Sequence, residues 1–300
     1  TECINAVTWA LESGYRHIDT ARIYGNEKEV GEAIRNFGIK REEVFITTKL
    51  WNDDHGYETA LKAFDKSLKT LNTGYIDCYL IHWPVKEKRK DSWKALEKIY
   101  ESGYCKSIGV SNYMIIHLEE LFTYANIIPV MNQVEFSPYN YQKDLLDLCN
   151  KNKIILEAYS PLTRMKKLDD PRVLPIAEKY NKTNAQVLIR WAIEHDLVVI
   201  PKSARKKRII ENADIFDFSL DKSDMEILDD LDEGFRWIQA SALINENYWN
   251  TRILAQYFGK MNKKSEAIST MEKAIELGGK MQSAPFDFDR MKQMLADWKK

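Results

Sequence analysis

Seven short β-rich runs, separated by helical patterns, constrain the fold of this chain more than any other feature of its sequence. The runs span residues 15–21, 44–50, 76–83, 107–112, 129–136, 154–160 and 197–203. Between them, apolar residues recur at spacings of three and four, as in residues 57–71 and 183–196, which predicts amphipathic helices. Regular alternation of strand and helix predicts parallel strands joined by right-handed crossovers. The periodicity alone allows either a doubly wound open sheet or a closed barrel.

Ionisable or amide side chains stand at the ends of these runs, after an apolar body. These residues are Asp19, Lys49, His82, Asn112, Gln133, Glu135, Tyr159 and Lys202. In a parallel barrel the carboxyl ends of all strands converge on one rim, where active sites lie. In an open sheet the outer strands would carry their polar ends too far from any one ligand. The strand ends therefore favour an α/β fold of the (β/α)8 TIM-barrel type.

An eight-stranded barrel needs one strand more than these runs supply. Residues 3–14 have the pattern of a helix that leads into Gly14, and a strand should precede this helix. We therefore expect that the chain is truncated at its N-terminus and lacks the first strand, or that the barrel is completed in another way. The strands that carry Asp19 and Lys49 would then border an open edge with unpaired backbone groups.

The C-terminal part of the chain has a different pattern. After about residue 237 no strand pattern occurs, so we expect a barrel at residues 1–237 and an all-α extension at 238–300. Residues 248–281 resemble a single tetratricopeptide-like helical hairpin, with packing positions at Leu254, Ala255, Phe258, Ala267 and Ala274. One such hairpin rarely folds alone. We therefore expect it to dock on the barrel, to pair with another copy or to belong to a longer helical array, and it could bind a protein partner; an unnatural fusion or a mispredicted gene is the alternative.

Charge and composition exclude several classes of function. The formal net charge is -1 and 44% of the residues are hydrophobic, which predicts an ordinary globular protein that does not bind nucleic acid. No apolar run approaches the roughly 20 residues of a membrane span, and no charged leader opens the chain, so we expect a cytoplasmic protein without a membrane partner. The four cysteines form no C-x-x-C pair and the five histidines no H-E-x-x-H motif, so we predict no metal site.

The residues around His82 indicate a specific chemistry. A lone buried histidine is usually a satisfied core residue, and a lysine such as Lys49 at the end of an apolar strand usually has a structural partner, here Asp19. Tyr24 lies in the loop after Asp19. An ammonium beside a tyrosine makes its proton easier to lose, and an imidazole can orient a substrate carbonyl. Reduction of a carbonyl to an alcohol requires such a proton donor, a group that tunes it, an anchor for that group and a stabiliser of the developing alkoxide.

Seven motifs occur together in this chain, in the order "GYRHIDTARIYGNE", "ITTKLW", "LIHWP", "IGVSN", "NQVEFSPY", "AYSPL" and "IPKSARKKRIIEN". In this order and spacing they resemble the aldo-keto reductase superfamily, over about residues 3–237. The resemblance implies an (α/β)8 barrel that binds NADPH in an extended form without a Rossmann motif, and no G-x-G-x-x-G occurs here. It also implies an N-terminal hairpin and a first strand, which the chain would lack.

The resemblance implies a catalytic role for four residues. The tetrad of the family falls on Asp19, Tyr24, Lys49 and His82, and all four residue types are present. Tyr24 would be the general acid in reduction, Lys49 would tune it, Asp19 would hold Lys49, and His82 would direct the carbonyl. The family's steroid double-bond reductases carry a glutamate in place of this histidine, so His82 indicates carbonyl reduction. The implied activity is reversible, NADPH-dependent reduction of an aldehyde or ketone to an alcohol, by an oxidoreductase acting on CH–OH donors.

The resemblance also implies the cofactor contacts. Ser111, Asn112 and Gln133 would bind the carboxamide, and Tyr159 would stack on the nicotinamide; strand ends with caps are the simpler interpretation of these motifs. The basic run "PKSARKKR" would bind the adenosine 2′-phosphate, although such a run is usually a solvated face. The predicted cofactor-binding residues are Ser111, Asn112, Gln133, Tyr159, Ser160, Leu162, Lys202, Ser203, Arg208, Glu211 and Asn212.

Four further residues follow catalytic positions and predict the substrate side of the site. Ile23, Trp51, Asn52 and Trp83 would line an apolar mouth for a small-molecule carbonyl substrate, with core packing as the alternative for each tryptophan. Two other functions stay open. One is a catalytically silent NADPH-binding barrel that acts as a regulatory protein through its helical tail, and the other is a truncated, inactive fragment.

Overall fold

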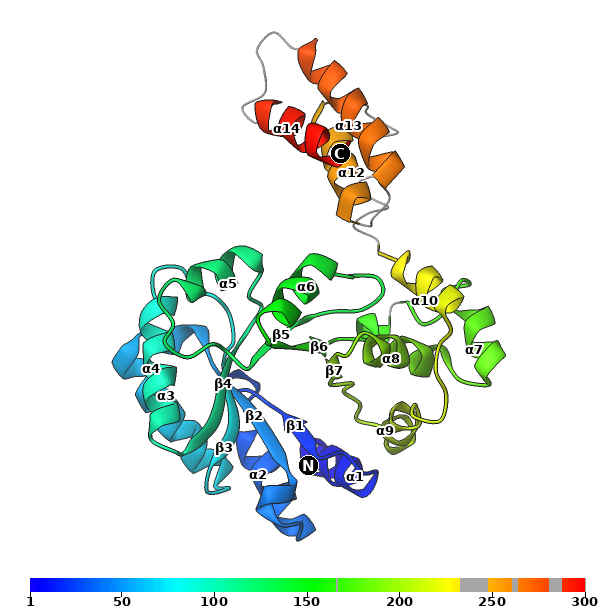
Figure 1. The fold of residues 1–300 in the computed structure, drawn as a ribbon. Helices are drawn as coiled ribbons and strands as arrows, with labels where there is room; N and C mark the ends of the chain where they lie inside the picture. Colours follow the sequence, from blue (N-terminus) through cyan, green and yellow to red (C-terminus); the bar gives the residue numbers. More distant parts are fainter. Residues whose placement is uncertain (166, 233–247, 261–263, 281–287, 300) are drawn as a thin grey trace. The chain divides into compact units, whose positions relative to one another are not determined.

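The computed structural model describes residues 1–165, 167–232, 248–260, 264–280 and 288–299 (Figure 1). The chain divides into two compact units, residues 1–138 with 145–229, and residues 139–144 with 230–300. The boundary predicted at residue 237 lies outside the described residues and stays a prediction. Within the described residues, no helix combines the length and the apolar character that a membrane span requires.

The first unit alternates strands and helices along the chain. Its strands are β1 His17–Asp19, β2 Phe45–Leu50, β3 Ile76–Ile81, β4 Cys105–Ser111, β5 Met131–Glu135, β6 Ile155–Tyr159 and β7 Val198–Val199. Its helices are α1 Glu2–Glu12, α2 Glu27–Phe37, α3 Tyr57–Leu71, α4 Arg89–Glu101, α5 Ile115–Phe122, α6 Lys143–Lys151, α7 Leu174–Tyr180, α8 Asn184–Glu194, α9 Lys206–Ala213 and α10 Lys222–Asp229. Short 3-10 helices include η1 Arg22–Tyr24, η3 Asn52–Asp54 and η4 Thr163–Met165. All seven predicted strands are confirmed, six of them within shorter bounds, whereas β4 begins two residues earlier than predicted.

The strands form one curled parallel sheet in the order β1-β2-β3-β4-β5-β6-β7 (Figure 1). This order decides between the two architectures that the periodicity allowed, because a doubly wound sheet reverses its strand order at a switch point and a barrel does not. In the described part of the chain, β1 and β7 are the two ends of the sheet, so an eighth strand is not among these residues. Truncation as the cause stays a prediction.

Close packing around the central strands holds their ends in place. Every residue of β3 is buried, including the fully buried Tyr79. Gly109 on β4 has no room for a side chain, because a Cβ atom there would lie 2.6 Å from the Met131 carbonyl oxygen and 2.7 Å from Leu80. On the helical side, the rings of Phe136 and Trp191 stack with their centroids 5.9 Å apart.

In the second unit, the described residues after residue 247 are helical. It contains α12 Tyr248–Lys260, α13 Lys264–Gly279 and α14 Phe288–Trp298. Ala255, Met271, Ala274 and Met291 form a buried apolar cluster among these helices. Residues 238–247 of the predicted extension lie outside the described residues, and the likeness of residues 248–281 to a tetratricopeptide unit stays a prediction.

Candidate active site

A cavity of about 710 Å³ lies where the carboxyl ends of the strands meet. Its lining includes Asp19, Tyr24, His82, Trp83, Asn112, Gln133, Tyr159, Ser160, Lys202 and Ser203. These residues are far apart in sequence, and they meet because parallel strands present their carboxyl ends at one edge. The cavity therefore collects side chains from β1, β5 and β6 and from the loops after β3, β4 and β7.

Lys49 and Asp19 form a buried ion pair beneath this cavity. Lys49 is fully buried, and its Nζ lies 2.6 and 2.7 Å from the two carboxylate oxygens of Asp19. A third hydrogen bond goes to the Thr20 carbonyl oxygen at 2.9 Å, so all three ammonium hydrogens have acceptors. Full pairing is what allows a lysine to stay buried and charged. The pair is thus a rigid positive and negative charge under the site.

Tyr24 lies above this pair, at the end of η1. Its side chain is half exposed, and the Lys49 Nζ lies 5.4 Å from the centre of its ring. Partial burial raises the pKa of Tyr24, the Lys49 ammonium lowers it, and the Asp19 carboxylate raises it. The expected direction of the lysine's effect is therefore present, but the net shift is upward and corrects the expectation of a more acidic phenol. The reason is that burial outweighs a cation already paired with a carboxylate.

His82 follows β3 and faces Tyr24 across the cavity. The two rings meet edge to face with centroids 5.8 Å apart, and the Trp51 ring lies 5.2 Å from the His82 ring. Burial and the Lys49 charge lower the pKa of His82 to about 4, against an opposing effect of Asp19. The imidazole is therefore neutral at pH 7. Its Nδ1 is buried without a hydrogen-bond partner among the described residues, so His82 does not behave as a satisfied core histidine.

Asn112, Ser111 and Tyr159 form a hydrogen-bonded group beside His82. Asn112 follows β4 in a left-handed conformation, with a φ of 61° that asparagine tolerates. Its Nδ2 donates to the His82 carbonyl oxygen at 2.9 Å and to Ser111 Oγ at 3.1 Å. The Tyr159 hydroxyl donates to Asn112 Oδ1 at 2.9 Å, and Ser111 Oγ donates to the Gln133 carbonyl oxygen at 2.8 Å. The simpler interpretation, strand ends with caps, therefore describes part of what these residues do.

The same group leaves only acceptors for a ligand. Both amide hydrogens of Asn112 and the hydroxyl hydrogen of Ser111 are used inside the protein. The Gln133 Nε2 donates to Asp19 Oδ2 at 2.7 Å and to a Glu157 carboxyl oxygen. These two bonds use both hydrogens of the Gln133 amide. Of the residues that line the chamber, Asn112 keeps a lone pair on Oδ1 and Gln133 keeps its lone pairs on Oε1. Such a set matches the NH2 of a carboxamide and would not accept a carboxylate.

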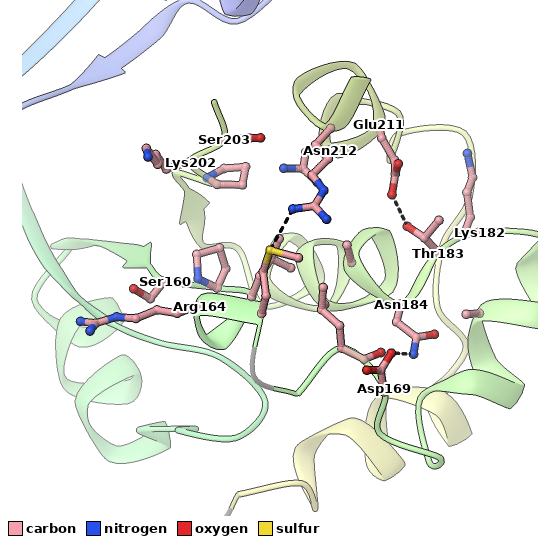
Figure 2. Close-up of a pocket in the computed structure, with 18 of the residues that line it drawn as sticks. Ser160, Arg164, Asp169, Lys182, Thr183, Asn184, Lys202, Ser203, Glu211 and Asn212 are labelled. Carbon is pink, nitrogen blue, oxygen red and sulfur yellow. Dashed lines mark hydrogen bonds between the residues drawn. The ribbon is translucent and has the colours of Figure 1, made fainter. Parts of the chain in front are cut away.

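A second cavity of about 800 Å³ adjoins the first (Figure 2). It is lined by seven of the eleven predicted cofactor-binding residues, namely Ser160, Leu162, Lys202, Ser203, Arg208, Glu211 and Asn212. The two cavities share Ser160, Arg164, Ile200, Pro201, Lys202 and Ser203. Together they form one two-chambered site. Of the eleven predicted cofactor residues, Ser111 alone lines neither chamber.

Two cations of the basic run line the second chamber and are available to an anion. Lys202 and Arg208 have no ion-pair partner in the described ranges. A guanidinium nitrogen of Arg208 lies 3.0 Å from the Met165 sulfur. By contrast, Lys206 of the same basic run pairs with Glu12 at 2.8 Å on the surface. Glu211 accepts a hydrogen bond from Thr183 Oγ1 at 2.9 Å (Figure 2). The basic run is thus divided between surface cations and cations that line the chamber.

The four predicted substrate residues lie around the first chamber. Trp83 is 43% exposed and lines it, whereas Ile23, Trp51 and Asn52 flank it without contributing to its lining. An ion pair between Arg22 and Asp54 joins the loop of Tyr24 to the loop that follows Trp51. Of the four residues predicted to line an apolar mouth, Trp83 alone therefore lines the chamber.

Two ionisable residues of the site were not predicted. Glu157 on β6 is completely buried, and its Oε1 lies 3.3 Å from Nδ1 of His17 on β1. A signal was present, because Glu157 interrupts an apolar strand two residues before Tyr159 and must share its face. Its partners cannot be found that way, since they come from other strands.

Among the described residues, no group of three or more potential ligands is arranged to hold a metal ion.

The comparisons with known proteins agree with this geometry. The model of the Aldo/keto reductase family matches residues 1–233. The chain belongs to the aldo/keto reductase family. It is 53% identical over 235 residues to the glyoxal reductase of Bacillus subtilis (strain 168), which covers 78% of this chain and 85% of that protein.

Solved aldo-keto reductases share its fold. An aldo-keto reductase from a Medee basin deep-sea metagenome library is 50% identical, with a TM-score of 0.76 over 78% of this chain and 88% of that chain. The aldo-keto reductase of Bombyx mori in complex with NADP is 38% identical, with a TM-score of 0.73 over 77% of this chain and 83% of that chain. The family assignment covers the residues of the two-chambered site.

Proposed function

We propose that this protein reduces an aldehyde or ketone to the alcohol with NADPH, reversibly. The observation that carries the proposal is the arrangement of Tyr24 and His82 above the buried Asp19–Lys49 pair. A hydroxyl and an unpartnered imidazole face one cavity, where a carbonyl oxygen can accept hydrogen bonds from both. This geometry does not favour the alternative of a catalytically silent barrel.

The electrostatics of the site give Tyr24 and His82 different roles in the reaction. A neutral imidazole with a pKa of about 4 does not act as an acid at pH 7, but its N–H can donate a hydrogen bond to the carbonyl oxygen. His82 would therefore orient and polarise the carbonyl. Tyr24 would deliver the proton to the oxygen as it becomes an alkoxide. The Lys49 ammonium would stabilise the tyrosinate that remains, because it is held at the ring by Asp19.

The two chambers fit a nicotinamide dinucleotide phosphate. Acceptors on Asn112 and Gln133 match a carboxamide NH2, and Tyr159 lies beside them. At the other end, Lys202 and Arg208 are cations without carboxylate partners, which suits a phosphate. When bound, the reduced nicotinamide would supply the hydride. The Bombyx mori relative is a complex with NADP, which supports the same cofactor here.

The activity is tested by following NADPH consumption with the full chain. The relative from Bacillus subtilis is named a glyoxal reductase, so the panel should begin with glyoxal and other small dicarbonyls and continue to aromatic and aliphatic aldehydes. We expect turnover with at least one of these substrates and the formation of its alcohol. A folded sample that binds NADPH and reduces no member of the panel would refute the proposal.

The choice of NADPH over NADH should depend on Arg208. Replacing Arg208 by Leu removes a charge-assisted contact to the 2′-phosphate and should raise the KM for NADPH about 10- to 100-fold. The KM for NADH should change little, since NADH has no phosphate at this position. Lys207→Ala, at an exposed position of the same basic run, is the matched control and should leave both constants unchanged. Equal losses for both cofactors in Arg208→Leu would place the guanidinium elsewhere.

A further inference from the structure

Glu157 is a buried carboxyl group next to the site for which the four-residue mechanism has no use. It is 0% exposed, and in the pairing of β5 with β6 it lies opposite Gln133. Its Oε2 accepts a hydrogen bond from the Gln133 Nε2, and its Oε1 has no hydrogen-bond partner among the described residues. Burying a carboxyl group costs free energy unless hydrogen bonds or an ion pair compensate it.

The Gln133 amide connects Glu157 to the ion pair beneath Tyr24. One Nε2 donates to both the Glu157 carboxyl and the Asp19 carboxylate, and Asp19 in turn holds Lys49. Because both neighbours are acceptors on this side, the amide must turn its NH2 toward them and its oxygen toward the cavity. Glu157 and Asp19 together thus decide which atom Gln133 presents to a ligand.

The groups that face Glu157 act on its pKa in both directions, and burial prevails. They are His17 and Asp19 on β1, Lys49 on β2, Cys78 on β3 and Gln133 on β5, while the paired residue on β7 is the apolar Val198. Burial first, and then the Asp19 charge, raise the pKa of Glu157 to about 8, against the opposing effects of the Gln133 hydrogen bond and the Lys49 charge. Burial also lowers the pKa of His17, so this histidine is neutral at pH 7.

The hydrogen-bond pattern is consistent with a neutral acid. His17 Nε2 lies 2.9 Å from Thr47 Oγ1, and an N–H donated there leaves Nδ1 as an acceptor. The Glu157 Oε1 stands 3.3 Å from that Nδ1, where a carboxylic acid proton would face it. An ionised Glu157 would instead place two carboxylates around one amide with a single lysine to balance them.

We propose that Glu157 is a positioning residue for the reductase proposed above: as a neutral acid it fixes the Gln133 amide between its own carboxyl and that of Asp19, and so holds both the Asp19–Lys49 pair and the Gln133 oxygen in place. The inference rests on the proposed function for its effect on turnover. Ionisation of Glu157 adds a negative charge under Lys49, which makes Tyr24 a weaker acid and slows reduction.

Two replacements separate the shape of Glu157 from its charge. Glu157→Gln keeps an acceptor for Gln133 and a donor toward His17 but cannot ionise, so its kcat and NADPH affinity at pH 7 should match the wild type. Glu157→Leu removes the acceptor and should weaken NADPH binding, followed by fluorescence quenching, about tenfold. Rescue by Gln and not by Leu is expected. Equal losses in both variants, or none in either, would overturn the positioning role.

The pH profile of kcat tests the protonation state. In the wild type, reduction should fall to a lower plateau above a pH of about 8, before the final loss when Tyr24 ionises. Glu157→Gln should lose the first step and keep the second. Glu97→Gln is the control, because Glu97 is a buried carboxyl that accepts from the Asn126 and Ile127 backbone amides away from the site. The same first step in Glu157→Gln would contradict the inference.

Two measurements do not depend on turnover, so they distinguish failure of the inference about Glu157 from failure of the proposed reductase function. Infrared difference spectra of the wild type against Glu157→Gln should show a protonated-carboxyl band at pH 7 that disappears on ionisation. A native pKa raised from 4.5 to about 8 makes the wild type lose stability as the pH rises through this window, and Gln does not. Glu157→Gln should therefore melt above the wild type at pH 8, with a gap that narrows toward pH 5. A lower melting temperature at pH 7 would instead indicate a His17–Glu157 ion pair and overturn the inference.

Discussion

Replacing Tyr24 by Phe should lower kcat for carbonyl reduction by about 10²- to 10⁴-fold, the range that a positioned general acid contributes. Phe lacks the hydroxyl that would deliver the proton, and neutral His82 does not replace it as an acid. The fold should be unaffected, because Tyr24 is 53% exposed and its hydroxyl has no hydrogen bond in the described part of the chain. NADPH affinity should also stay within about twofold, since the change removes no contact in the adenosine chamber.

Single-turnover measurement of NADPH oxidation separates the chemical step from binding and product release. Tyr104→Phe is the matched control, because Tyr104 is 57% exposed and lies before β4, at the opposite end of the strands. It should be indistinguishable from the wild type. Activity of Tyr24→Phe within tenfold of the wild type would show that the proton comes from another group or from water.

Replacing Lys49 by Met should cost both stability and activity. Removing one partner of a buried ion pair leaves the other charge uncompensated, which typically destabilises a protein by about 3–5 kcal/mol. The side chain of Asp19 is only 11% exposed and would lose two of its hydrogen bonds. Turnover should fall by about 100-fold or more, because the ammonium that stabilises a tyrosinate is gone.

The double replacement Asp19→Asn with Lys49→Met separates these two effects. A neutral pair removes the uncompensated charge, so most of the lost stability should return, whereas activity should stay low. Urea denaturation followed by tryptophan fluorescence measures the first, and NADPH oxidation the second. Lys98→Met is the surface control, because Lys98 and Glu101 are each 60% exposed and such pairs are worth about 0–1 kcal/mol. Recovery of activity in the double variant would show that Lys49 acts only on the fold.

Much of the first unit was predictable because its signals are local. A parallel strand buried on both faces is a continuous apolar run, and the helix that follows has its own spacing, so seven strands stand out in the sequence. Polar residues such as Asp19 and Lys49 at the ends of those runs were predictable for the same reason. Their convergence follows from the rule that parallel strands end on one side.

Other properties were not predictable because they depend on several strands at once. The pKa of Tyr24 is a balance between burial and two charges, and only the structure shows that burial prevails. The absence of a partner for His82 Nδ1 in the described residues is likewise a property of the packed site. Glu157 was visible as a carboxyl in an apolar strand, but its connection to Asp19 runs through Gln133 on a third strand.

The alternation of strands and helices, the identity of the four residues around His82 and the resemblance to the aldo-keto reductases can all be predicted from the sequence. These features depend on residue type and spacing along one chain. The tertiary structure alone decided the sequential strand order, the shared wall of the two cavities and the chain of hydrogen bonds from Glu157 through Gln133 to Asp19 and Lys49. Hydrogen bonds and desolvation act over a few ångströms in space, so groups more than 100 residues apart set each other's charge only after the chain has folded.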